Sequence, residues 1–291
     1  MLRKGDLTQG GITGTLLHFT LPMMVGSFLQ QCYNIADTLI VGQCIGAGAL
    51  AAVGSAYTLM VFLISVLLGL AMGSGTVFSL HYGAGNHVAL RRSIFSSFVL
   101  IGIVTLILNV AVFIWLGPIL RLLQVPQDIY GMMRSYLWII FCGIVFTFIY
   151  NFYASLLRAV GDSVTPIWFL AVSVVLNIAL DLFFILQLDW GIQGAAAATV
   201  LAQGVAALGI IIYTYRRRPE LRWHHEDMCF DRTCLKEIAS FSTLTCVQQS
   251  VMNLGILMIQ GLVNSFGTAV MAAFAAAVKI DSFAYMPVQE F

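Results

Sequence analysis

Acidic side chains inside long apolar stretches are the residues of this sequence best placed to do chemistry. Asp37 lies in the outer half of the first such stretch, residues 15–41, shortly after the polar run at residues 30–34. An aspartate near the centre of a membrane helix costs about 2.5–3.5 kcal/mol on the insertion scale. Such a residue normally faces a protein interior or a wet cavity, where it binds a proton, an ion or a substrate. The polar run favours this interpretation over an aspartate satisfied by water near the headgroups.

A second candidate pair lies in the fifth apolar stretch. Asn177 and Asp181 are four residues apart, so they share one face of a helix. The amide can hold the carboxyl group in place, and burial disfavours its charged form, so this acid could load and release protons near physiological pH. A simple helix-packing pair is the alternative. Thr199 and Gln203 have the same spacing in the sixth stretch, where interhelical hydrogen bonding is the ordinary explanation.

Three other groups have weaker claims to chemistry. Arg158, Gly161 and Asp162 form a compact turn, in which we expect Arg158 to pair with Asp162 and Gly161 to permit the bend. Asp281 lies in the last apolar stretch near Lys279 and Glu290, so an ion pair is as good an explanation as a site. The spacing of the remaining group fits no standard zinc finger, so we expect no metal site at His224, His225, Cys229 and Cys234.

Composition identifies the class of protein. Of the 291 residues, 60% are hydrophobic and 9% are charged, whereas a soluble domain has about 25% charged residues. The sequence therefore predicts an all-α, polytopic membrane protein, and its net charge of +1 gives no reason to expect nucleic acid as a partner. It contains no GxxxxGK[ST] and no HExxH, and residues 159–162 lack the first glycine of a GxGD protease pattern. We expect no enzyme and no cofactor.

Hydrophobic stretches long enough to cross a bilayer organise the chain. Residues 1–215 are predicted to form a bundle of six spans, residues 216–238 a cytoplasmic linker loop, and residues 239–291 the start of a second bundle. The third span is expected to stop at Gly117-Pro118, followed by an interfacial segment with a turn at Pro126. The chain stops within or just past an eighth span, so we expect a truncated protein. The predicted spans of the first bundle are 15–41, 49–80, 94–116, 135–157, 164–187 and 192–214.

Basic residues give the expected orientation. If alternate loops lie on one side, eleven of the fourteen Lys and Arg fall together, which predicts a multi-pass protein of the cell membrane with a cytoplasmic N-terminus. A faint repeat relates the first and seventh spans, since Gln30-Gln31 is echoed by Gln248-Gln249. Such repeats are common in transporters, whose sites lie near the bilayer midplane. The eleven residues are Arg3, Lys4, Arg91, Arg92, Arg158, Arg216, Arg217, Arg218, Arg222, Arg232 and Lys236.

Five short motifs, in order along the chain, resemble the multidrug and toxic compound extrusion (MATE) transporters, and most of all their DinF-like branch. The motifs are Pro22 with Asp37; Gly42, Gly46 and Ala51-Ala52; Arg158-Ala159-x-Gly161-Asp162-x-x-x-Pro166; Asn177-Ile178-x-x-Asp181 with Phe184-Ile185; and Gly194-Ala195-Ala196-x-Ala198-Thr199. The resemblance covers essentially the whole chain.

This resemblance implies a twelve-helix exporter of two repeat-related six-helix bundles, here truncated. It implies an antiporter in which H⁺ or Na⁺ entry drives export of cationic, amphipathic compounds. The family's coupling residues fall on Asp37 and Asp181, with Asn177 and Thr199 beside them, and Pro22 falls on a proline where the first helix is proposed to bend. We expect a monomer in contact with membrane lipid and small organic cations. The polar residues expected to line the substrate cavity are Gln31, Asn34, Asn151, Gln203 and Gln249.

Two departures from the family pattern qualify these expectations. The seventh span has Gln248 and Gln249 where another branch carries a coupling glutamate, which favours coupling in the first bundle. The chain is also shorter than such proteins usually are, so the fragment alone is expected not to transport. A flippase for lipid-linked saccharides, from the same superfamily, is the alternative function. It would need a cationic cavity for phosphate, and no Arg or Lys lies inside the first six predicted spans.

Overall fold

The computed structural model describes residues 12–223, 227 and 232–289, without side chains at 12–19, 232–234, 279 and 282–289. Every regular element in this described part is helical. The α-helices are α1 (Ile12–Cys44), α2 (Ala47–Gly83), α3 (His87–Leu122), α4 (Gln127–Cys142), α5 (Ile144–Ala159), α6 (Val164–Leu182), α7 (Gly191–Arg217), α8 (Arg232–Asn264) and α9 (Thr268–Gln289). A π-helical turn, η1 (Phe183–Gln187), extends α6, and a short 3₁₀ helix, η2 (Pro219–Leu221), follows α7.

The lengths of these helices fit a polytopic membrane protein. Within the described residues, five helices are long and apolar enough to cross a bilayer: α2, α3, α6 with η1, α7 and α8. The α4–α5 pair makes a sixth if it counts as one bent span. The described part of α1 does not join them on composition, because Gln30, Gln31, Asn34 and Asp37 interrupt its apolar sequence. The described part of α9 contains a shorter apolar segment, Thr268–Val278.

One predicted boundary was wrong, and one predicted span is bent. α3 does not stop at Gly117-Pro118 but continues to Leu122, because a proline removes a single helical hydrogen bond and the buried Leu116 and Leu120 hold the last turn. The predicted single span 135–157 is two helices that meet at Gly143 and are bent by 50°. A Cβ atom at Gly143 would lie 2.5 Å from a methyl group of Val200, so this residue must be small for the bend to pack on α7.

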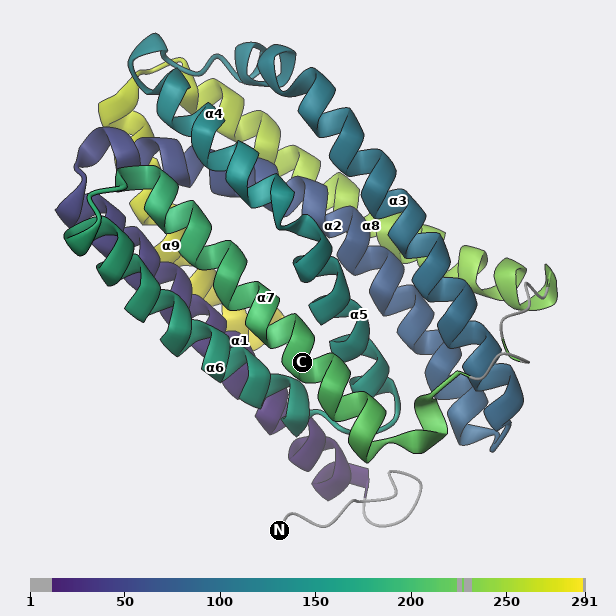
Figure 1. Ribbon diagram of the computed structural model, residues 1–291. Helices are drawn as coiled ribbons and strands as arrows, with labels where there is room; N and C mark the ends of the chain where they lie inside the picture. The colour runs from purple at the N-terminus through teal and green to yellow at the C-terminus, as the bar shows by residue number, and fades with distance from the viewer. Residues whose placement is uncertain (1–11, 224–226, 228–231, 290–291) are drawn as a thin grey trace.

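The helices of the predicted first bundle, α1 to α7, are named here the first helix group (Figure 1). α1, α6 and α7 lie side by side, and α4 and α5 pack on α7 and α2. On its other side, α2 packs along α8 more extensively than any other pair of helices does in the described part of the chain. Because α8 follows the predicted linker, the contact between α2 and α8 is where the two predicted bundles meet.

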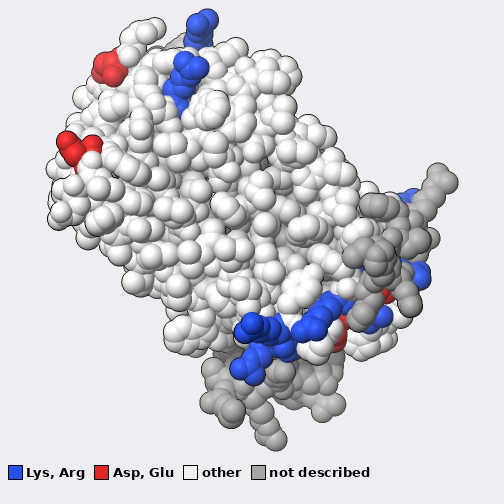
Figure 2. Space-filling view, viewed as in Figure 1, with Lys and Arg blue, Asp and Glu red and all other residues white. Residues whose placement is uncertain are grey.

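Charged side chains gather at the ends of the bundle and leave a broad uncharged belt between them (Figure 2). One end, here named the arginine-rich end, carries most of the described cations: Arg91, Arg92, Arg158, Arg216, Arg217, Arg218, Arg222 and Lys236. The opposite end carries Arg121 and Arg134. This distribution fits a bilayer around the belt.

The predicted pairing of Arg158 with Asp162 was wrong. Asp162 accepts hydrogen bonds from the amide and the hydroxyl of Thr165 at the start of α6, so its carboxylate faces α6 and α7. Its partner is Arg218, whose Nη2 lies 3.2 Å from Asp162 Oδ2. Burial alone lowers the pKa of Arg218, but hydrogen bonds to Asp162 and Glu220 raise it, so the guanidinium stays charged. Gly161 has φ +85°, a conformation that favours glycine in this turn.

Candidate functional site

Two buried acids from different helices share one site in the core of the first helix group. Asp37 on α1 is 9% exposed, and Asp181 at the end of α6 is fully buried. The two carboxyl groups lie within hydrogen-bonding reach of each other. A hydrogen bond between two carboxyl groups requires a proton on one of them, since two carboxylates at this distance would repel. We name this pair with its polar neighbours Asn177, Thr199 and Tyr33 the acid cluster.

The three neighbours hold the acid pair in place. In the orientation that satisfies both ends of the Asn177 amide, its nitrogen donates to Asp181 Oδ2 at 2.9 Å and its oxygen accepts from the Thr199 backbone amide at 3.1 Å. The Thr199 hydroxyl lies 3.3 Å from the Tyr33 hydroxyl and donates to the Ala195 carbonyl at 3.1 Å. The amide is therefore a bridge between α6 and α7, and the Tyr33 hydroxyl brings in α1.

Small residues explain how three helices come so close. α7 buries alanines on the side that packs against α6 and α5, and small side chains let membrane helices approach each other. On α6, the spacing of four residues places Asn177 and Asp181 one above the other. The sequence predicted this shared face, and the structure shows that Thr199 lies opposite it.

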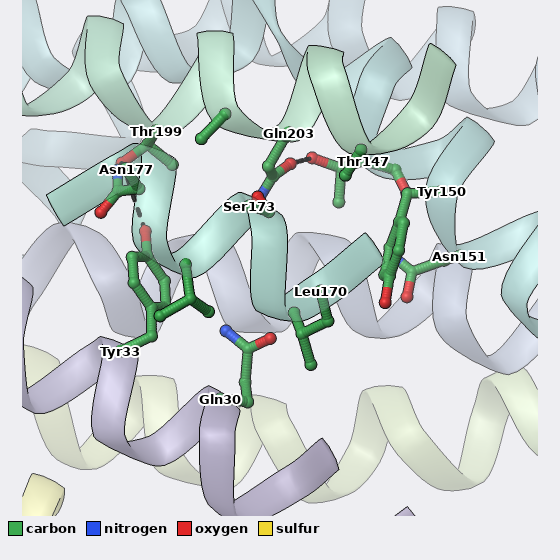
Figure 3. A pocket seen from close by; sticks show the side chains of 13 residues that line it. Gln30, Tyr33, Thr147, Tyr150, Asn151, Leu170, Ser173, Asn177, Thr199 and Gln203 are labelled. Atoms are coloured by element: carbon green, nitrogen blue, oxygen red, sulfur yellow. Dashed lines mark hydrogen bonds between the residues drawn. The ribbon is translucent and has the colours of Figure 1, made fainter. Parts of the chain in front are cut away.

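A polar cavity of about 100 Å³ adjoins the acid cluster (Figure 3). It lies among α1, α5, α6 and α7, and Tyr33, Asn177 and Thr199 form part of its wall. Its other polar lining residues are neutral: Gln30, Thr147, Tyr150, Asn151, Ser173 and Gln203. Figure 3 shows Gln203 hydrogen-bonded to Thr147 across the cavity. A cavity of this size is large enough for water, since one water molecule needs about 10–15 Å³ of such space.

Two of the five residues predicted to line a substrate cavity line the polar cavity, and three do not. Asn151 and Gln203 line the polar cavity. Gln31 and Asn34 do not, because their side chains hydrogen-bond each other along α1 at 3.4 Å, and Gln30 takes the place facing the cavity. Gln249 lies away from it on α8, with its amide 3.9 Å from the sulfur of Met72.

Other predicted positions lie apart from the acid cluster. Pro22 is inside α1, which is one continuous helix from Ile12 to Cys44, so the expected bend stays a prediction. Asp281 is exposed on α9. Among the described residues no group of three or more His, Cys, Asp or Glu could hold a metal ion. His224, His225 and Cys229 lie outside the described residues, as does the side chain of Cys234.

Sequence reasoning missed the two tyrosines of the site. Tyr33 contacts Thr199, and Tyr136 on α4 is buried close to both acids and to Tyr33. Tyr33 is four residues before Asp37, the same spacing that singled out Asn177 and Asp181, so this signal was available. Nothing in the sequence near Tyr136 marks it, because its neighbours in space come from other helices.

Comparisons with known proteins identify one family of transporters. The MatE family model matches residues 22–183. The chain is 32% identical over 293 aligned positions to "Probable multidrug resistance protein YpnP" of Bacillus subtilis (strain 168), covering 98% of this chain and 64% of that protein. The structure of the MATE multidrug transporter DinF-BH in complex with a small-molecule ligand matches with a TM-score of 0.87 and 27% identity, over 94% of this chain and 62% of that one. An inward-facing MATE transporter of the MOP superfamily matches with a TM-score of 0.82 and 25% identity, over 94% and 62% of the two chains.

An all-helical membrane bundle with paired acids buried beside a polar cavity has the architecture of a transporter rather than that of an enzyme. The chain belongs to the MatE family, the multidrug efflux transporters known as MATE proteins. It spans 59–64% of the length of three of the curated relatives that it matches.

Proposed function

We propose that this chain performs the coupling step of a cation-coupled antiporter, in which entry of H⁺ or Na⁺ drives export of a cationic, amphipathic compound. The observation that carries the proposal is the acid pair itself. Asp37 and Asp181 come from two helices, share one site and adjoin a cavity lined by neutral polar groups. A site of this kind lies inside the membrane and can bind either a proton or a metal cation there.

The chemistry of the site supports coupling in a simple way. With a proton, the two carboxyl groups attract each other and hold α1 against α6. Without it they repel, unless a cation lies between them, so occupancy of the site changes the energy of the α1–α6 contact. A cation can drive export only if it binds the two arrangements of these helices with different affinity. The organic cation must prefer the arrangement that the proton or Na⁺ disfavours.

The distribution of charged residues gives the orientation that we propose for the protein in the membrane. The arginine-rich end would face the cytoplasm, and the opposite end would face outside. Substrate would then leave past the end that carries Arg121 and Arg134. The flippase alternative has less support, since none of the described residues that line the cavity is an Arg or Lys that could hold a phosphate.

Ligand-linked proton release tests the coupling step without requiring a whole transport cycle. The protein is placed in lipid nanodiscs in weakly buffered solution, and rhodamine 6G is added as the organic cation while a pH electrode follows the protons released. We expect proton release by the parent protein, and a loss of most of it with Asp37→Asn or Asp181→Asn, because each change removes one of the two carboxyl groups that share the proton. If Na⁺ is the coupling ion, sodium should instead weaken rhodamine 6G binding to the parent and not to these variants.

Asp189→Asn is the matched control, because Asp189 is an exposed aspartate in the turn that follows α6. It should behave as the parent protein does. The proposal is wrong if both acid variants bind rhodamine 6G, release protons as the parent does and show no altered response to sodium.

A further inference from the structure

A second buried polar cluster joins α8 to the first helix group at the end opposite the arginines. Asn264 and Gln260 on α8 are 1% and 2% exposed, and Ser55 and Thr58 on α2 are 1% and 7% exposed. They meet the backbone carbonyl of Leu123, just beyond α3. We name these five groups the α2–α8 latch. None of them titrates.

Four hydrogen bonds satisfy the latch. Ser55 Oγ donates to Asn264 Oδ1 at 3.1 Å, and Thr58 Oγ1 donates to Gln260 Oε1 at 3.1 Å. Gln260 Nε2 donates to Asn264 Oδ1 at 2.8 Å, and Asn264 Nδ2 donates to the Leu123 carbonyl at 2.8 Å. Asn264 is the centre of the network, because it bonds to α2, to its own helix and to the segment between α3 and α4.

The rest of the α2–α8 contact is built differently. Nearer the arginine-rich end, the backbones themselves touch, since a Cβ atom at Gly69 or Gly73 would lie 2.4 Å from the Cα atom of Cys246 or Ser242. The polar links there include short hydroxyl contacts, Ser74 to Ser242 at 3.4 Å and Ser242 to the Leu70 carbonyl at 3.1 Å. The latch differs because its contact runs through amide side chains, which accept from the two hydroxyls, bond to each other and donate to the Leu123 carbonyl.

We propose that the α2–α8 latch is the polar seal that closes the path between the two predicted bundles at the end opposite the arginines, and that it must part for a substrate to leave there. The physical reason lies in the chemistry of amides and hydroxyls. Closed, these groups bond to one another and are satisfied in a dry environment. Open, each can bond to water instead, so both states are satisfied. An apolar seal would favour only the closed state.

This inference rests on the proposed function for its purpose, but its test needs neither substrate nor coupling. Ser65 on α2 lies on the same helix face as Ser55, Thr58 and Gly69, further along toward the arginine-rich end, and is 2% exposed. Ser65→Cys, in a background whose six native cysteines are replaced by serine, is a small change that reports access past the latch. The readout is the labelling rate with a membrane-impermeant maleimide.

The test variant is Asn264→Asp, which preserves shape but replaces the Nδ2 donor by an oxygen that faces the Leu123 carbonyl. At alkaline pH this repulsion should open the contact and raise labelling about tenfold, equivalent to about 1.4 kcal/mol. At acidic pH the new carboxyl group is protonated, donates again and should return labelling toward the parent rate. Dividing each rate by that of the parent at the same pH removes the pH dependence of the thiol itself.

Asn253→Asp is the matched control, because Asn253 is a buried amide on the same helix that bonds only within it, to the Gln249 carbonyl at 2.9 Å. It should leave labelling unchanged. If Asn264→Asp labels like this control, or labels faster to the same extent at both pH values, the latch is not a seal. Should Asn264→Asp fold poorly, Thr58→Val removes one of the four bonds and should raise labelling less. Unaltered proton release in both Asp37→Asn and Asp181→Asn, with no altered response to sodium, would overturn the antiporter and leave this result untouched.

Discussion

The acid cluster and the α2–α8 latch are both buried polar clusters, yet they are built for different tasks. The acid cluster lies inside one helix group, contains two carboxyl groups and adjoins a cavity. The latch lies between the first helix group and α8, contains only neutral amides, hydroxyls and a carbonyl, and does not line the polar cavity. The first can change its charge, whereas the second can only be made or broken. The difference separates the part that binds a cation from the part that closes a path.

The helix contacts at the acid cluster and along α2 and α8 are stabilised in different ways. In the acid cluster, side chains meet through hydrogen bonds. Along α2 and α8, glycine lets the two backbones approach directly, and van der Waals contact does the work that the hydrophobic effect does in water. Substitutions along α2 and α8 should therefore destabilise the protein by overpacking, and substitutions in the acid cluster by the loss of hydrogen bonds.

The largest effect on stability is expected from Gly73→Ala. Its new Cβ atom would lie 2.4 Å from Ser242 Cα, which is backbone and cannot rotate away, so α8 must shift. Overpacking of this kind costs about 1–3 kcal/mol. Gly255→Ala on α8 is the control, since a Cβ atom there meets nothing within 4 Å and alanine favours the helix by about 0.8–1 kcal/mol. Thermal unfolding in nanodiscs should show opposite shifts, and equal shifts would mean that α2 and α8 do not pack so closely.

Much of the fold was predictable because composition and hydrophobic length carry it. Each predicted span is helical where the structure describes it, although residues 135–157 are divided between two helices. An apolar run in a membrane must satisfy its own backbone hydrogen bonds. The break at Gly143 was not predictable, because it depends on Val200, a contact from another part of the chain. The pairing of Asp162 with Arg218 instead of Arg158 was also not predictable, because Arg218 comes from a distant part of the chain.

The candidate site was predictable where periodicity or resemblance marked it. The burial cost of an acid in an apolar stretch marked Asp37, spacing placed Asn177 and Asp181 on one face, and the resemblance singled out Thr199. None of these signals could show that all four meet. The latch went unnoticed because serine, threonine, asparagine and glutamine are common in membrane helices. Only their contact across α2 and α8 distinguishes them.

A stability effect of similar size, joined to an effect on function, is expected from Asn177→Leu. The change removes the bridge between Asp181 Oδ2 and the Thr199 amide and leaves buried polar groups unsatisfied, at a cost of about 1–3 kcal/mol. Rhodamine 6G binding should also lose much of its dependence on pH, because the acid pair is no longer held in place. Asn253→Leu removes an amide that bonds only within α8, so it should leave that pH dependence unchanged. A normal pH response in Asn177→Leu would mean that the bridge does not position the acids.

The smallest effect is expected from Tyr33→Phe, which removes one hydroxyl contact of 3.3 Å while Thr199 keeps its bond to Ala195. The loss of stability should be about 0.5–1.5 kcal/mol. Tyr33→Phe is to be compared with Thr58→Val, which removes one hydroxyl hydrogen bond of 3.1 Å from the latch. If the two clusters have separate tasks, Tyr33→Phe should alter the pH dependence of rhodamine 6G binding and leave labelling at Ser65→Cys unchanged. Thr58→Val should do the reverse, whereas a variant that changed both readouts would show that the clusters act as one unit.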